Sequence, residues 1–385
     1  MPGPQGYAWL LVVWLSLGCA ALPDPLAGCR PDFSYHGGWL GADAAYSVPL
    51  GDRTLWLFGD TFVGRPSAAD RQDSTFIHNS VGISRCTRDG WKIRYVWGRT
   101  DEGLPNDFLA RPVNGWWWLF DGFTHDGALL LGLLEVEEAP PRGPLALPFR
   151  FTGVELARIE NPGDPPEAWR SEILPLHAGT RAVPSSALVP HGEYLYLFTF
   201  LTDAAGRHPR VLARTRLDSL IGAGARPDQS LQYLSQAGTW KPGLDADDAR
   251  VLMHDSATEM SVDRVGNGWL AVYSHPNTRG DFAAAGADDR VYARAAASLE
   301  GPWSEPFVVH RVRELADPEE PTTACYAGKA HPHLSETGTL TLTYVCNLFT
   351  PPGEDSTPIL RRLLVDMELY HPVVVTIEEL ADMQE

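Results

Sequence analysis

Runs of apolar residues that follow a turn-forming glycine recur along this chain. Some runs alternate apolar and polar residues and others are continuous, and both patterns are typical of short strands that follow tight turns. The pattern predicts five copies of one turn and strand, at residues 51–58, 126–134, 191–198, 266–273 and 337–344. A regular series of this kind indicates a repeated β unit.

A second β-rich stretch ending in arginine follows the first four copies, at residues 81–85, 154–158, 211–214 and 291–294. The fifth copy has a weaker match at residues 360–365. A further strand-like stretch precedes each turn, so the unit is strand, turn, strand, loop, strand. Its first strands are marked by Asp43, Asp121, Pro184, Glu259 and His331.

These units predict an all-β fold, a five-bladed β-propeller at residues 30–378 with about four antiparallel strands per blade around a central channel. Sheets repeated around an axis bury both faces of every blade and leave only short edges. A β-sandwich or jelly roll is the competing architecture, but it would not predict five similar hairpins. No long amphipathic helix is evident, and only residues 377–385 could form a helical turn or two.

The ends of the chain carry other signals. Residues 9–17 are an apolar run followed by small residues, which predicts a signal peptide at 1–21, although Lys and Arg are absent before the run. The run is too short to span a bilayer. We expect a linker at 22–29, an acidic tail at 379–385 and a secreted or periplasmic protein, with lipidation at Cys19 as an alternative.

The cysteine count fits an oxidising compartment. Removal or lipidation of Cys19 leaves four of the five cysteines, an even set. Cys325 and Cys346 flank a turn and should pair across one hairpin, and Cys29 should then pair with Cys86. There is no C-x-x-C sequence, so a thiolate zinc site is not expected.

The formal net charge of −18 disfavours nucleic acid and anionic membrane surfaces as partners. A neutral ligand or a cation fits better, although acidity can also serve solubility alone. We expect a monomer.

Residues 39–50, followed by 55–62, resemble the secreted proteins grouped as domain of unknown function 4185. More distantly, they resemble five-bladed glycoside hydrolases of the arabinanase and β-xylosidase kind. Sequences at 79–82, 257–262, 294–303 and 329–333 strengthen the likeness, which covers nearly the whole mature chain. It implies a five-bladed propeller and, as in some relatives, action on arabinan-type polysaccharides by carboxylates on the innermost strands.

Glycoside cleavage commonly uses two carboxyl groups, one to donate a proton and one to activate water or attack the sugar. Acids on the first strands are the candidates, because these strands line the axis of a propeller. We predict Glu259 as general acid, Asp43 or Asp60 as base or nucleophile, and Asp121 as a group that tunes their pKa values. Two alternatives stay open: a buried salt bridge from Glu259 to Arg181 or Arg294, and an Asx turn at Asp60.

Aromatic and polar side chains near these acids are candidates for sugar binding. They are Trp39, His78, Asn79, Trp118, Arg181, His254 and His331. His331 and His333 flank a proline, which breaks a strand ladder, so hydrogen bonding is favoured over a metal site. We expect no cofactor, with a central Ca²⁺ or other cation as the alternative.

The sequence thus predicts a secreted glycoside hydrolase that acts on an arabinan-type or related polysaccharide. Serine-nucleophile and phosphate-loop motifs are missing, which excludes hydrolases and kinases of those kinds. A carbohydrate-binding or cell-surface propeller without catalysis is the alternative, because a fold does not dictate an activity.

Overall fold

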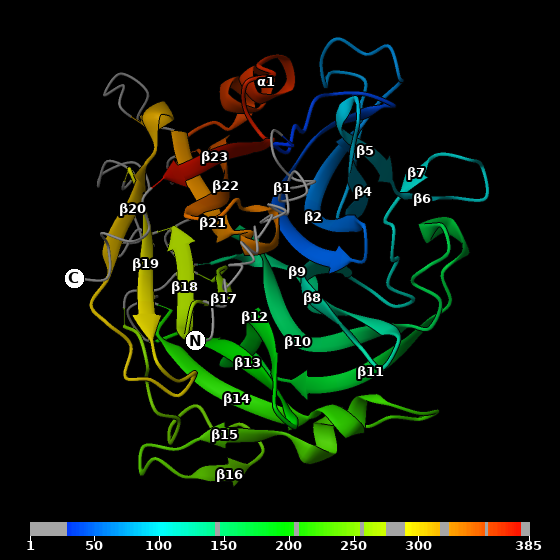
Figure 1. Cartoon of the computed structure of the whole chain (residues 1–385). Coiled ribbons are helices and arrows are strands. Elements are labelled where there is room, and N and C mark those ends of the chain that lie inside the picture. The colour runs from blue at the N-terminus through cyan, green and yellow to red at the C-terminus, as the bar shows by residue number, and fades with distance from the viewer. Residues whose placement is uncertain are drawn as a thin grey trace, which may run out of the picture.

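The computed structural model describes residues 29–142, 147–203, 208–254, 258–274, 289–315, 323–350 and 353–378. Its strands form five small antiparallel sheets arranged in a ring (Figure 1). The predicted signal peptide and acidic tail lie outside the described residues.

Each sheet is one blade, and its strands follow in sequence order. Blade 1 contains β1 (Trp39–Leu50), β2 (Arg53–Val63), β3 (Thr75–Ile77), β4 (Ser80–Thr87) and β5 (Gly90–Val96). Blade 2 contains β8 (Trp116–His125), β9 (Ala128–Arg142), β10 (Leu147–Ile159) and β11 (Ser171–Ala178). Blade 3 contains β12 (Ala182–His191), β13 (Tyr194–Leu201), β14 (Arg210–Arg216), β15 (Gln232–Leu234) and β16 (Trp240–Pro242).

The last two blades are smaller. Blade 4 contains β17 (Ser261–Val265), β18 (Gly268–Ser274), β19 (Arg290–Ala296) and β20 (Phe307–Arg311). Blade 5 contains β21 (Thr323–Ala330), β22 (Thr339–Leu348) and β23 (Pro372–Glu378). A separate ribbon pairs β6 (Gly98–Arg99) with β7 (Pro105–Asn106), and the one described α-helix is α1 (Thr357–Val365).

The first strands of the blades close the ring. β1 contacts β8, β8 contacts β12, β12 contacts β17, β17 contacts β21, and β21 contacts β1. These five strands therefore surround the axis, as the propeller prediction requires, and the sandwich alternative is wrong. Apolar side chains between neighbouring blades fill the core, with the largest cluster spanning blades 1, 2 and 3.

The predicted hairpins are present in the first four blades with two-residue turns. The closing pairs are Leu50 with Arg53, His125 with Ala128, His191 with Tyr194, and Val265 with Gly268. Each turn contains a glycine with a positive φ, which suits the twist of a tight hairpin. In blade 5, β21 and β22 also pair, but through a longer connection.

Blade 5 departs from the sequence prediction at residues 360–365. This stretch lies in α1, and the third strand of the blade is β23 instead. Pro358 lies in the first turn of the helix, and the Asp355 carboxylate accepts hydrogen bonds from the backbone N–H of Thr357 at 2.9 Å and from its hydroxyl at 2.7 Å. Proline at this position favours helix initiation, and Leu363 anchors the apolar face. Since Ile377 belongs to β23, the expected helical turn does not begin there.

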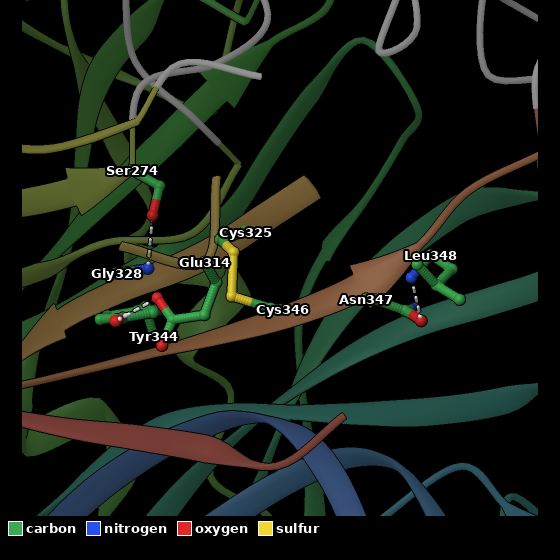
Figure 2. Close-up of a disulfide and its surroundings, with 8 residues drawn as sticks. All are labelled: Ser274, Glu314, Cys325, Gly328, Tyr344, Cys346, Asn347 and Leu348. Carbon is green, nitrogen blue, oxygen red and sulfur yellow. Dashed lines mark hydrogen bonds between the residues drawn. A yellow bond between two sulfur atoms is a disulfide. The ribbon is translucent and has the colours of Figure 1, made fainter. Parts of the chain in front are cut away.

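Both predicted disulfides are present. Cys325 and Cys346 are directly paired residues of β21 and β22, with Cα atoms 4.0 Å apart, and Figure 2 shows the bridge between these strands. Cys29 is bonded to Cys86 on β4. The neighbour of Cys325, Tyr326, reaches the candidate active site described below, so this bridge fixes a strand that carries a site residue.

Replacing both Cys325 and Cys346 with serine should lower the free energy of unfolding by about 3 kcal/mol, because the bridge closes a loop of roughly 20 residues in the unfolded chain. Urea denaturation followed by circular dichroism measures this. An unchanged midpoint would show that strand pairing alone holds β21 against β22.

Candidate functional site

Irregular backbone at the start of β1 positions Asp43. The pairing of β1 with β2 shifts register around Ala42 and Ala44, and Ala44 has a φ of 70°. A non-glycine residue in the left-handed region costs on the order of 1 kcal/mol or more and is found disproportionately at functional sites. Gly59 on β2 faces Asp43, and a Cβ atom there would lie 2.5 Å from its Oδ1 atom. The missing side chain of Gly59 therefore leaves the space that the Asp43 carboxyl group occupies.

Two tyrosines donate hydrogen bonds to Asp43, one on β21 and one just before β23. The Tyr326 hydroxyl lies 2.9 Å from Oδ2, and the Tyr370 hydroxyl lies 3.4 Å from the same atom. Burial raises the pKa of Asp43 well above its ordinary value, and the charges of Asp60 and Glu259 raise it further. The Tyr326 hydrogen bond opposes this rise without cancelling it. Asp43 is therefore harder to ionise than an exposed aspartate.

Asp60, on β2, is held by two ring nitrogens. Trp118 Nε1 donates to its Oδ1 at 2.7 Å, and His78 Nδ1 lies 3.0 Å from the same oxygen. Burial alone would lower the pKa of His78, but its hydrogen bond to Asp60 and the charges of Asp60 and Asp107 raise it overall. The His78 ring stacks on Trp116 at 4.2 Å. Asp60 is thus a fixed acceptor beside an aromatic surface, and the Asx turn is not observed among its bonds.

Glu259 forms an ion pair with Lys329 of β21, with 2.6 Å between Oε2 and Nζ. The lysine side chain is 1% exposed, whereas that of Glu259 is 28% exposed. Nζ also donates to the carbonyls of Ala44 at 2.9 Å and Ala327 at 3.1 Å, and it lies 4.1 Å from the centre of the Tyr46 ring. Burial lowers the pKa of Lys329, while the charge of Glu259 opposes this. The lysine is positioned to stabilise the negative carboxylate.

The sequence-based alternative named the wrong cations for this salt bridge. Arg181 is 67% exposed and pairs with Asp247 at 2.6 Å. Arg294 donates to the Tyr273 hydroxyl at 3.0 Å and to the Ser304 carbonyl at 2.6 Å. The partner of Glu259 comes instead from the innermost strand of blade 5.

Two further carboxyl groups lie on innermost strands. Asp121 on β8 accepts the N–H of Gly122 at 2.7 Å and that of Leu188 on β12 at 2.6 Å, which links blades 2 and 3. Burial raises its pKa to about 6 despite these bonds. Asp263 on β17 has a buried Oδ2 without a hydrogen-bond partner. Burial, followed by the charge of Asp121, raises its pKa to about 7.

Electrostatic interactions connect the four predicted acids with Lys329. The charges of Asp60 and Glu259 act on Asp43, and the charges of Glu259, Asp43 and Asp121 act on Lys329. We call these five residues the central cluster. It contains all four acids predicted as catalytic.

Only some of the predicted sugar-binding residues lie at this cluster. His78 and Trp118 contact Asp60, as described. Trp39 is fully buried and stacks on Tyr95 at 4.2 Å, and Asn79 is fully buried and bonds to the backbone of Leu109. These two positions support the blade rather than face solvent.

His331, another predicted binding residue, lies near Lys329 of the cluster, whose charge contributes to lowering its pKa. His331 is buried, with Nδ1 2.5 Å from Ser47 Oγ and Nε2 2.8 Å from Thr343 Oγ1. Burial lowers its pKa well below the ordinary value. It therefore joins blades 1 and 5 as a neutral ring. Arg181 and His254 are exposed.

The sequence predictions did not include Asp263, and they named Lys329 and Tyr326 only as neighbours of His331 and His333 that could help to orient a sugar hydroxyl or bind an ion. A lysine between Gly328 and Ala330 in an apolar strand is costly unless it is paired, and that signal could have singled it out. Asp263 stands beside an arginine in a polar stretch, so its burial has no clear mark in the sequence.

Within the described ranges, no group of three or more His, Cys, Asp or Glu side chains has the geometry of a metal site, and no helix is long and apolar enough to cross a membrane.

A pocket of about 550 Å³ lies elsewhere, between the outer strand of blade 1 and the end of blade 2. Its walls include Trp97, Phe108 and Trp169. None of the central carboxyl groups lines it, so it is not part of the candidate active site.

Comparison with known proteins gives a family and a fold. A model described as "Domain of unknown function (DUF5005)" matches residues 33–359. The chain belongs to this family. The resemblance to domain of unknown function 4185 is not confirmed. No protein with a curated description matches the sequence.

Solved structures are also similar to this member of the family. A Bacteroides ovatus protein described as "a putative hydrolase" superposes with a TM-score of 0.64 at 16% identity, over 90% of this chain and 87% of that chain. Weaker matches are a GH43_1 enzyme from Xanthomonas citri complexed with xylotriose (TM-score 0.46, 13% identity, 92% and 91% coverage) and a Cellvibrio cellulosa α-L-arabinanase (0.45, 10%, 88% and 91%). At these identities the first likeness supports the propeller fold.

Proposed function

We propose that this protein is a secreted glycoside hydrolase that cleaves a polysaccharide at the central cluster. The observation that carries the proposal is a pair of carboxyl groups whose surroundings favour opposite protonation states. Burial and neighbouring charges raise the pKa of Asp43 well above its ordinary value, whereas Glu259 forms an ion pair with Lys329. Neighbouring acids that differ in this way are suited to acid and base roles in one reaction.

Asp43 is the proton donor in this mechanism. Its raised pKa favours a bound proton, which it would deliver to the glycosidic oxygen as the bond breaks. Asp60 contributes its negative charge, which raises the pKa of Asp43, and His78 and Trp118 keep Asp60 in place. Asp121 contributes to the negative field around Lys329.

Glu259 is the base or nucleophile in this mechanism. The salt bridge leaves its second oxygen to face a water molecule or a sugar carbon, and the side chain is partly exposed. This assignment reverses the roles expected from the sequence, in which Glu259 donated the proton. The reason is Lys329, because an adjacent ammonium group favours a carboxylate over a carboxylic acid.

Aromatic rings beside Asp60 support a sugar substrate. Phe76 is 45% exposed and contacts His78 edge-on, and His78 stacks on Trp116. Ring faces of this kind pack well against the apolar faces of sugars. The resemblance to arabinanases suggests an arabinan-type or related polysaccharide, and two disulfides suit an oxidising, extracytoplasmic location.

A non-catalytic carbohydrate-binding propeller is the second candidate. The ion pair itself favours it, because a buried lysine between blades also serves structure alone. A glycoside hydrolase releases sugar products from the polysaccharide, whereas a binding propeller releases none.

A polysaccharide panel that includes arabinan and xylan tests the proposal. We expect wild-type protein to release reducing ends from at least one member and Asp43→Asn to release none at an equal protein concentration. Binding of a polysaccharide by both proteins without release of reducing ends would overturn catalysis and support the binding module.

Gly59→Ala tests the position of Asp43 without changing any ionisable group. The added Cβ would lie 2.5 Å from Oδ1, so the carboxyl group must move. Displacement of a catalytic group by about 1 Å can cost about 10²-fold in rate. We expect kcat to fall by about that factor with little change in Tm, as measured by reducing-end release and thermal unfolding. Unchanged kcat would separate Asp43 from the chemistry.

A further inference from the structure

The pocket between blades 1 and 2 is a formed space that the proposed mechanism does not use. Its volume of about 550 Å³ falls within the roughly 300–1,000 Å³ that is usual for small-ligand sites. It lies beside β5 and β11, the outer strands of these blades, whereas the central cluster is built mainly on innermost strands (Figure 1). A ligand in this pocket does not touch the central carboxyl groups.

Three aromatic side chains line the pocket. Trp97 packs against the apolar cluster that contains Trp39 and Phe58. Trp169 and Phe108 meet edge-on, with ring centres 5.9 Å apart. All three lining rings are only half-buried, so part of each remains open to a ligand. Ring faces of this kind pack well against the apolar C–H faces of sugars.

Trp169 is held in place in the absence of a ligand. Its Nε1 donates to the carbonyl of Asp164 at 2.9 Å. The Asn161 side chain closes the same loop, since its oxygen accepts the N–H of Arg170 at 2.8 Å and its nitrogen donates to the carbonyl of Ala168 at 2.9 Å. A loop tied in this way loses little conformational freedom when a ligand binds, which favours affinity.

Asn79 holds another part of the wall. Its backbone carbonyl accepts the N–H of Phe108 at 3.0 Å, and its side-chain oxygen accepts the N–H of Leu109 at 2.8 Å. Its Nδ2 donates to the carbonyls of Leu109 at 3.1 Å and Trp117 at 2.9 Å. Asn79 is fully buried, so it positions two lining residues without contacting a ligand itself.

The charged groups of the pocket suit a neutral ligand with hydroxyl groups. Glu167 lines the pocket and is neutralised by an ion pair with Arg94. Arg99 also lines it and donates through Nη1 to the carbonyl of Gly103 at 2.9 Å. A guanidinium has five N–H donors, so others remain for the oxygens of a ligand. A sugar matches both the rings and these donors, whereas a purely apolar ligand matches the rings alone.

We propose that this pocket binds a sugar unit of the polysaccharide, as a second contact apart from the site of cleavage. The choice of polysaccharide rests on the proposed function. A long chain that is held at two places binds more tightly than one held at either place alone, because the second contact is intramolecular. The pocket therefore adds affinity for the polymer and takes no part in bond breaking.

Affinity electrophoresis in native gels that contain arabinan, xylan or β-glucan tests the pocket. Every protein carries Asp43→Asn, so that the polymer is not cleaved during the run. At least one polymer should retard this parent protein. Trp97→Ala and Trp169→Ala should each raise the Kd for that polymer by about 10-fold, because each removes an aromatic face from the pocket.

Trp240→Ala is the matched control. Trp240 is also a half-buried tryptophan, but it lies on blade 3, where it stacks on Arg214 at 4.0 Å and does not line the pocket. This variant should keep the Kd of the parent. Should either alanine variant not fold, as judged by circular dichroism, Trp97→Phe and Trp169→Phe replace them. These keep a ring in the packing contact and should still raise Kd by about 2–5-fold.

The outcomes separate this proposal from the proposed function. Unchanged Kd in the variants at positions 97 and 169 would overturn the pocket, and so would the absence of retardation in all three gels. If wild-type protein nevertheless releases reducing ends, the glycoside hydrolase proposal stands without the pocket. If Kd rises in these variants but wild-type protein releases no reducing ends from the same polymer, the pocket stands and catalysis is overturned.

Discussion

Asp43→Asn is expected to lower kcat/KM on a polysaccharide by about 10²–10⁴-fold. The amide cannot deliver the proton that a sugar leaving group needs. An aryl glycoside with a good leaving group needs little protonation, so the same variant should retain most of its activity on that substrate. The alkaline fall of the pH–rate profile, which reports loss of the Asp43 proton, should disappear. Steady-state kinetics on both substrates measures all three effects.

Glu259→Gln should behave differently from Asp43→Asn. Loss of a base or nucleophile slows both substrates, because neither the good nor the poor leaving group replaces the attacking group. Added azide should restore part of the activity on the aryl glycoside by taking the place of the missing carboxylate. The opposite pattern, with Glu259→Gln active on the aryl glycoside and Asp43→Asn inactive, would return the donor role to Glu259.

Stability controls are needed for Glu259→Gln, because it leaves the ammonium of Lys329 buried without its partner. Breaking one side of a buried ion pair costs about 3–5 kcal/mol. The double variant Glu259→Gln/Lys329→Gln removes both charges and should recover part of the lost Tm without recovering activity. Asp52→Asn, at an exposed hairpin turn, should match the wild type in both measurements.

Local sequence patterns predicted the blades well because hairpins are local structures. Period-two alternation and a turn glycine are both visible in about ten residues, and they fixed the turn between Leu50 and Arg53 and its counterparts. The pairing of Cys325 with Cys346 followed from the same hairpin logic. The strand predicted at residues 360–365 was wrong because these residues lie in α1, and their apolar spacing is compatible with either element.

The site was less predictable because its contacts join distant parts of the chain. Glu259 and Lys329 are brought together by the ring of blades, so no local pattern could name the lysine in place of Arg181 or Arg294. Repeat position predicted that Asp43, Asp121 and Glu259 would lie near one another. It failed to predict that His331 would turn into the wall between blades 1 and 5, where Ser47 and Thr343 bind its ring.

Asp263→Asn should stabilise the protein at pH 8 and destabilise it at pH 4, where the wild-type carboxyl group is protonated and only the unpaired N–H of the asparagine counts. Burial and the charge of Asp121 raise the pKa of Asp263 from 3.8 to about 7, so the folded chain holds this proton more tightly than the unfolded chain. Below pH 4 both states are protonated and the residue contributes nothing. As pH rises from about 4 to about 7, the unfolded state ionises first, and the free energy of unfolding falls.

The size of this effect follows from the pKa. A rise from 3.8 to about 7 corresponds to roughly 4 kcal/mol at 1.36 kcal/mol per pKa unit, as an upper bound. An asparagine keeps an acceptor for Ser261 but leaves a buried N–H unpaired, which costs about 1–3 kcal/mol. The net gain at pH 8 is therefore expected to be about 1–3 kcal/mol. Asp121, whose pKa is raised to about 6, adds a smaller effect of the same sign.

Urea denaturation of the wild type, Asp263→Asn and the exposed control Asp52→Asn at pH 4, 6 and 8 measures these differences. The stability of Asp263→Asn relative to the wild type should grow with pH, while Asp52→Asn should track the wild type throughout. Parallel curves for all three proteins would show that Asp263 is ionised in the folded state at no cost. If Asp263→Asn is more stable at pH 8, folding alone does not explain the aspartate, because asparagine would serve the structure better. A gain in stability together with a loss of polysaccharide cleavage would therefore assign Asp263 to the working site.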